Sequence, residues 1–128
     1  MKLIDKIKLS NSLELQLLDR SRVIAGDRWL VSLEAKIEID VDKRYLSGVE
    51  EADKIVSILK KYYGNKVSYS YVQEKHFVDE KEKEDVMKGF ISNVKKTVNY
   101  LSHPEFAKKT LLAKYRDLKK KAPWLFQQ

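Results

Sequence analysis

Cysteine is absent from this chain of 128 residues, which excludes disulfides, cysteine nucleophiles and cysteine-ligated zinc or iron–sulfur sites. Glycine is scarce, and its four positions are too far apart for a phosphate-binding loop or a dinucleotide-binding turn: Gly26, Gly48, Gly64 and Gly89. The two histidines, His76 and His103, lack the spacing of metal ligands. We therefore expect no catalytic residues, no metal site and no cofactor, and a binding protein rather than an enzyme.

Long apolar runs are missing as well. No segment approaches the 18 or so consecutive apolar residues that suggest a transmembrane helix. The first ten residues contain three lysines and one aspartate, so they do not resemble the apolar core of a signal peptide. These features predict a cytoplasmic protein without a transmembrane segment.

Acidic residues are rare in the last third of the chain. Residues 1–87 hold 16 basic and 17 acidic side chains, whereas residues 88–128 hold 10 basic and only 2 acidic ones. The net charge of +7 therefore comes from residues 88–128. Such asymmetry suggests an anionic partner for that region.

The overall composition is that of a folded protein, with 43% hydrophobic and 35% charged residues. A chain of this length normally forms one domain, and its composition is far from that of disordered segments. We expect a single α+β domain over residues 1–128.

The clearest structural pattern runs from Trp29 to Asp42. Odd-numbered residues there are apolar and most even-numbered residues are polar, which predicts a long strand with one buried face. For the odd-numbered leucines of the preceding strand to share that face, the numbers of paired residues must add up to an even value. A three-residue loop at Gly26–Arg28 satisfies this condition and places Arg20 opposite Glu34.

Similar alternation predicts further strands over residues 3–9, 13–17 and 65–78. A capping box at Ser47 and Glu50 predicts a helix that ends at Gly64, and two more helices are expected from Glu80 and from Ser102. The predicted order is βββ-α-β-α-α. Because the sheet has one polar face, we expect a two-layer sandwich with a mainly antiparallel four-stranded sheet, a long hairpin and three helices packed on one face.

Two aromatic residues of the predicted last strand, Tyr69 and Tyr71, allow two interpretations. Exposed rings on a sheet can stack on RNA bases, whereas rings that face the helices complete the core. The mixed charge of the polar sheet face favours the core.

Basic side chains repeat at helical spacing in the last two predicted helices. The positions expected to face outward are Lys88, Lys95 and Lys96 in one helix and Lys109, Arg116 and Lys120 in the next. A short turn at His103 would present both groups together, and such a stripe suits a phosphate backbone. The alternative is a solvated helix face that maintains solubility.

The end of the chain holds three bulky apolar residues after a run of lysines, namely Trp124, Leu125 and Phe126. Exposure of such side chains is unfavourable, by about 1.5–3 kcal/mol each. We expect this tail to fold back onto its own core. The alternatives are that it docks on a neighbouring subunit, or lies in a membrane interface with the lysines on anionic lipid.

Three functions are consistent with these observations. The first is a small binding module that holds nucleic acid or another polyanion through the basic C-terminal helices. The second is a homo-oligomer or protein–protein interaction module that uses the long hairpin or the tail. The third is a small-molecule enzyme without a recognisable motif, which a deep pocket with converging polar groups would favour.

Overall fold

The computed structural model describes residues 1–126 and divides the chain into two compact units. The first unit contains Met1–Ile37 and Ser70–His103, and the second contains Glu38–Tyr69 and the residues from Pro104 on. The strands β4 (Arg28–Asp40) and β5 (Lys66–Asp79) each have residues in both units.

The sheet is antiparallel along β1, β2, β4 and β3. It is built from β1 (Lys2–Lys8), β2 (Glu14–Asp19), β3 (Arg22–Ala25), β4 (Arg28–Asp40) and β5 (Lys66–Asp79). The strand order is β1-β2-β4-β3, and β5 also pairs with β4. The long strand β4 is therefore the centre of the sheet, with residues that pair with β2, β3 and β5.

The pairing of β2 with β4 confirms the predicted parity. Leu17 lies opposite Ala35 and Leu18 lies opposite Glu34, so the numbers of paired residues add up to 52. The particular pairing of Arg20 with Glu34 was wrong by two residues, because Leu18 takes the place opposite Glu34. The turn consists of Gly26 and Asp27, and a register shift between Val23 and Ala25 restores the even parity.

Alternation along β4 is present in the structure as expected. The odd-numbered side chains of Val31, Leu33 and Ile37 are buried, whereas Glu34 and Lys36 are half-buried and Glu38 is exposed. Leu30 and Ser32 are exceptions, because both are buried although they have even numbers. For Ser32 a hydrogen bond accounts for this. Its backbone amide donates a hydrogen bond of 3.0 Å to Ser21 Oγ, so the buried backbone there is satisfied.

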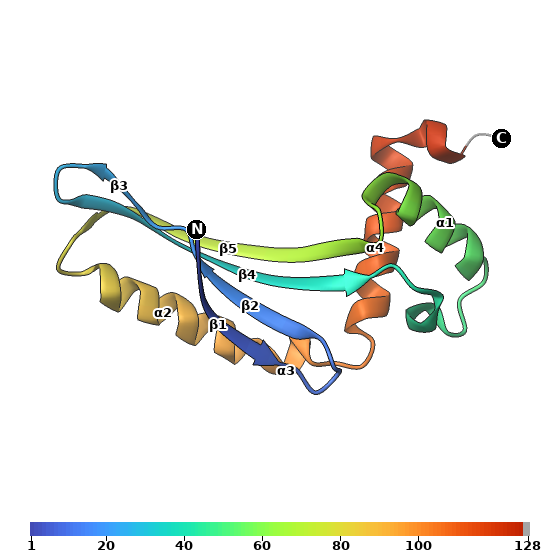
Figure 1. Ribbon diagram of the computed structural model, residues 1–128, viewed down its shortest axis with the longest axis horizontal. Coiled ribbons are helices and arrows are strands. Elements are labelled where there is room, and N and C mark those ends of the chain that lie inside the picture. The colour runs from blue at the N-terminus through green and yellow to red at the C-terminus, as the bar shows by residue number, and fades with distance from the viewer. Residues whose placement is uncertain (127–128) are drawn as a thin grey trace. The chain divides into compact units, whose positions relative to one another are not determined.

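In the first unit, helix α2 (Lys83–Lys96) covers one face of the sheet (Figure 1). Val94 is the buried residue of α2. The short helix α3 (Val98–Leu101) follows after Thr97, and its buried residue is Leu101. Gln73 links β5 to α2, because its Nε2 donates to Phe90 O at 3.1 Å and its Oε1 accepts from Asn93 Nδ2 at 3.0 Å.

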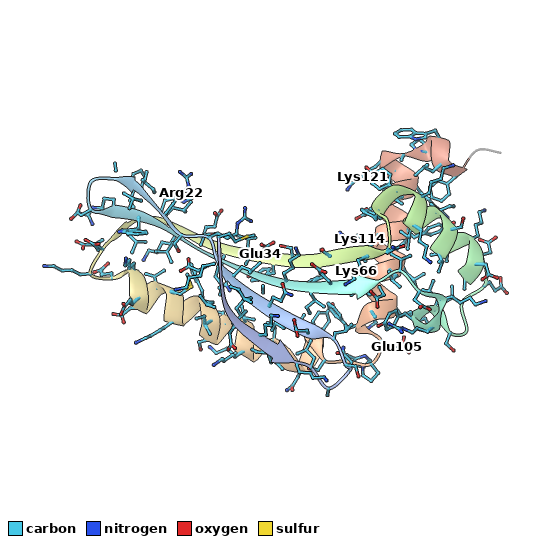
Figure 2. All side chains as sticks on the ribbon, in the orientation of Figure 1. Arg22, Glu34, Lys66, Glu105, Lys114 and Lys121 are labelled. Atoms are coloured by element: carbon cyan, nitrogen blue, oxygen red, sulfur yellow. The ribbon has the colours of Figure 1, made fainter. Side chains whose placement is uncertain are left out.

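A polar cluster lies on the other face of the same unit. Glu34, labelled in Figure 2, accepts a hydrogen bond of 2.5 Å from Ser70 Oγ. Arg20 Nη1 lies 3.8 Å from the second oxygen of that carboxylate. Arg20 thus contacts Glu34 although Leu18 occupies the position directly opposite.

The second unit packs α1 (Ala52–Tyr63) against α4 (Phe106–Lys121), together with the short 3-10 helices η1 (Lys43–Leu46) and η2 (Pro123–Phe126). Its buried side chains include Leu59 of α1, Leu46 of η1, and Leu111 and Leu118 of α4. The buried positions of each long helix recur at helical spacing, for example Ile55, Ile58 and Leu59 in α1, which explains why these segments form helices with one buried face.

The start of α1 differs from the prediction. Asp42 caps η1 by accepting a hydrogen bond of 2.9 Å from the Arg44 amide, and Ser47 ends that short helix instead of starting α1. The helix begins at Ala52, and no side chain caps its first turn. Its end at Gly64 was predicted correctly, since this glycine has a φ of 89° and its amide bonds to Lys60 O.

The α+β class, the mainly antiparallel sheet and the long hairpin strand are confirmed. The predicted order of the main elements is also present, with β3 and α3 as additional elements. Because of β3 the sheet has five strands instead of the predicted four. The short strand β3 follows directly on β2, and for this reason the alternation of residues 13–25 does not show where one strand ends.

The two tyrosines of β5 differ in burial. Tyr69 is half-buried and meets Phe106 edge to face, with ring centroids 5.2 Å apart, as expected for a core residue. Tyr71 is 52% exposed, so the prediction that it is buried was wrong. Burial thus decreases along β5 from Val67 to Tyr71.

Within residues 1–126, no helix combines the length and the apolar character that crossing a membrane requires.

Candidate nucleic-acid interface

Helix α4 carries three cationic side chains on one face. Lys109, Arg116 and Lys120 are exposed and fall within an arc of about 40° at 3.6 residues per turn. At a rise of about 1.5 Å per residue they span about 16 Å along the axis. In the part of the chain that the structure describes, none of the three forms an ion pair. We refer to these three residues as the α4 basic face.

Other lysines of α4 have contacts within the second unit. Lys108 Nζ lies 3.8 Å from Glu105 Oε2 and donates to Ser47 O at 3.3 Å. The ammonium of Lys114, labelled in Figure 2, lies 5.8 Å from the centre of the Tyr63 ring. Lys119 Nζ lies 5.0 Å from the centre of the Tyr115 ring. These three lysines contact other residues of the second unit, and for this reason we do not include them in the α4 basic face.

A shallow hollow of about 420 Å³ lies along the α4 basic face. Ala113, Arg116, Asp117, Lys119 and Lys120 line it. The short side chain of Ala113 leaves space between the cations, and Asp117 is the one carboxylate in the lining. The hollow can accept an anionic group that the flanking cations neutralise.

The other predicted cations lie in the first unit. Lys88, Lys95 and Lys96 are exposed on α2, and none of them has an ion-pair partner among residues 1–126. The predicted stripe thus consists of two groups, one on α2 and one on α4, that belong to different units.

Several cations of the strands, of their connections and of η1 form ion pairs, in contrast to these helical cations. The ion pairs are Lys6–Glu14, Arg20–Glu34, Arg28–Asp79, Lys43–Asp53, Arg44–Asp40 and Lys66–Glu38. An unpaired cation remains available for an external anion without the loss of an internal ion pair. This difference makes the helical cations the better candidates for binding.

The C-terminal tail divides into one exposed and two half-buried side chains. Trp124 is 63% exposed, whereas Leu125 and Phe126 are half-buried within the second unit. Phe126 meets Tyr115 edge to face with a centroid distance of 5.3 Å. Leu125 and Phe126 therefore dock on their own chain, and Trp124 faces solvent.

The surroundings of Tyr115 in the second unit change the pKa of its hydroxyl. Burial raises the pKa of the Tyr115 hydroxyl above its ordinary value of 10.0, and the charge of Glu51 adds to this effect. Both causes disfavour the phenolate, because a charge is poorly solvated there and repelled by the carboxylate.

A second hollow, of about 470 Å³, lies in the first unit and was not predicted from the sequence. Within it, Trp29 and Lys83 form a cation–π contact, with the Lys83 ammonium 3.9 Å from the centre of the ring. The alternation of β4 placed Trp29 on the buried face, but no local pattern links it to Lys83. Only the packing of α2 on the sheet brings the two together.

Neither histidine joins a metal-binding group. His76 and His103 are both exposed, and no cluster of three potential metal ligands occurs among the residues that the structure describes.

No family model matches the chain, and no curated protein and no solved structure is significantly similar to it.

Proposed function

We propose that this protein is a small binding module that holds nucleic acid through the α4 basic face. The observation that carries the proposal is the set of three exposed, unpaired cations that follow one another along a single helix face. Neutralisation of phosphates by such cations releases counterions, which favours binding without a sequence-specific motif. The absence of cysteine fits a cytoplasmic location for this activity.

The charge of the second unit supports the same function. Its segments 38–69 and 104–128 hold 13 basic and 8 acidic residues, and the first unit holds 13 and 11. Lys88, Lys95 and Lys96 on α2 give the first unit a smaller group of unpaired cations. We assign these three lysines a secondary role as additional phosphate contacts.

The test is fluorescence anisotropy with labelled duplex DNA and RNA at several salt concentrations. Three phosphate contacts on α4 predict a decrease in log affinity of about 2.7 for each tenfold increase in salt. The triple variant Lys109→Glu, Arg116→Glu and Lys120→Glu should abolish binding without unfolding, because exposed substitutions change stability by about 0.5 kcal/mol or less.

A matched control separates the α4 basic face from net charge alone. Lys54→Glu, Lys60→Glu and Lys61→Glu reverse three exposed charges on α1 of the same unit. This control should retain most of the binding. Equal loss of binding in both triple variants, or no binding at low salt, would refute the proposed interface.

A self-association role is the second candidate, and the exposure of Trp124 favours it. Tryptophan is enriched among the few residues that contribute most of the binding energy of protein interfaces. If the protein forms a dimer through this residue, Trp124→Lys should convert it to a monomer in sedimentation velocity. A wild-type monomer at high concentration would exclude this role.

A further inference from the structure

The hollow of the first unit is large enough for a small molecule. Its volume of about 470 Å³ falls in the usual range of ligand pockets, which is about 300–1,000 Å³. Lys2 and Asp19 line it from the ends of β1 and β2, and Trp29 and Val31 line it from β4. The first turns of α2 contribute Lys83, Glu84, Met87 and Lys88, and Ser21 completes the lining.

The side chain of Trp29 provides the flat surface of this hollow. The indole is half-buried and extends a buried row that continues with Val31. The Lys83 ammonium lies 3.9 Å from the centre of the ring, within the range of a cation–π contact. The ammonium thus lies over the face of the indole, and a planar ligand that stacks on this face would take its place. The displaced ammonium would then meet the ligand at its edge.

Unpaired charges surround the ring. Lys2, Lys83 and Lys88 have no ion-pair partner in the described chain, and the Lys83 ammonium contacts only the Trp29 ring among the interactions of this hollow. A ligand can therefore bind all three ammonium groups without the loss of an internal ion pair. The two carboxylates of the hollow belong to Asp19 and Glu84. Asp19 already accepts a hydrogen bond of 2.9 Å from the Ser21 amide. The cations outnumber the carboxylates, which favours an anionic ligand.

We propose that this hollow binds a nucleotide, with the base stacked on Trp29 and the phosphate held by Lys83. Base–aromatic stacking accepts any base, and lysine is a common ligand of phosphate. Lys2 and Lys88 line the same hollow and add to its positive charge. The proposal does not rest on the α4 basic face, because every residue of the hollow belongs to the first unit.

The experiment uses tryptophan fluorescence of the full chain with Trp124→Phe, in which Trp29 is the single tryptophan. AMP, adenosine and inorganic phosphate are titrated separately. AMP should quench Trp29 with saturation, and adenosine and phosphate should each bind at least about tenfold more weakly, because each makes only part of the contacts. Absence of saturable quenching by AMP up to several millimolar would overturn the proposal.

Variants at two neighbouring lysines test the assignment of the phosphate. Lys83→Gln should weaken AMP binding by about tenfold, the effect of losing one charge-assisted contact. Lys81→Gln is the matched control, because Lys81 is exposed and does not line the hollow. Equal affinity in the Lys83 and Lys81 variants would contradict the site.

Two sources of the nucleotide can be distinguished with a short single-stranded oligonucleotide of adenines. If the physiological ligand is a strand, the oligonucleotide should quench Trp29 more strongly than AMP, and if it is a free nucleotide the order should be reversed. The α4 triple charge-reversal variant should lose duplex binding and keep AMP binding. Loss of both in that variant would show that the hollow is not an independent site.

Discussion

Phe126 packs edge to face on Tyr115, and this contact holds the C-terminal tail on the second unit. Because Phe126 is only half-buried, Phe126→Ala should lower the free energy of unfolding by about 1–2 kcal/mol. Trp124→Ala is the control, and its effect should stay within about 0.5 kcal/mol because Trp124 is largely exposed. Urea denaturation measures both. A larger loss in the Trp124 variant would show that Trp124, and not Phe126, anchors the tail.

The raised pKa of Tyr115 predicts a loss of stability at alkaline pH. The folded protein binds the phenolic proton more tightly than the unfolded chain does. This contribution is complete below the unfolded value of about 10 and is lost as the pH rises through the higher folded pKa. Tyr115→Phe should therefore make the unfolding free energy less dependent on pH above 10. Identical pH profiles for the variant and the wild type would contradict the assignment.

Asn11 binds the end of α3 through its side-chain amide in the first unit. Its Nδ2 donates to Leu101 O at 2.9 Å and to His103 O at 3.0 Å. Asn11→Asp keeps the shape but removes both donors, and we expect it to cost about 1–3 kcal/mol. Ser10→Ala is the control, since the Ser10 hydroxyl makes one long hydrogen bond of 3.4 Å to Ser102 O. Equal thermal stability of the two variants would argue against this role of Asn11.

The parity of β4 predicts opposite effects for neighbouring positions. Leu33 is fully buried and Leu33→Ala should destabilise the protein by about 2–5 kcal/mol, because it creates a cavity in the core. Glu38 is exposed on the other face, and Glu38→Ala should change stability by no more than about 0.5 kcal/mol. Thermal denaturation followed by circular dichroism distinguishes these outcomes. A comparable loss in both variants would mean that the two faces of β4 are not distinct.

Several features of the fold could be predicted from local sequence alone. The alternation from Trp29 to Val41 determines which face of β4 is buried, because successive side chains of a strand point to opposite sides. The same alternation requires that the numbers of two paired residues in the hairpin add up to an even value. The paired residue numbers of β2 and β4 add up to 52, and not to the predicted 54, because the register shifts between Val23 and Ala25. This shift has no sequence signature, since β3 follows β2 almost without interruption.

The candidate sites show a similar division. Helical spacing alone predicted that Lys109, Arg116 and Lys120 share an outward face, since 3.6 residues per turn bring them to the same side of α4. Whether a cation is paired depends on its spatial neighbours, so the ion pairs of the strand cations could not be predicted. The contact of Lys83 with Trp29 joins positions far apart in the chain, and only the packing of α2 on the sheet produces it. Local periodicity thus determined which side chains face outward, and tertiary packing decided which of them meet.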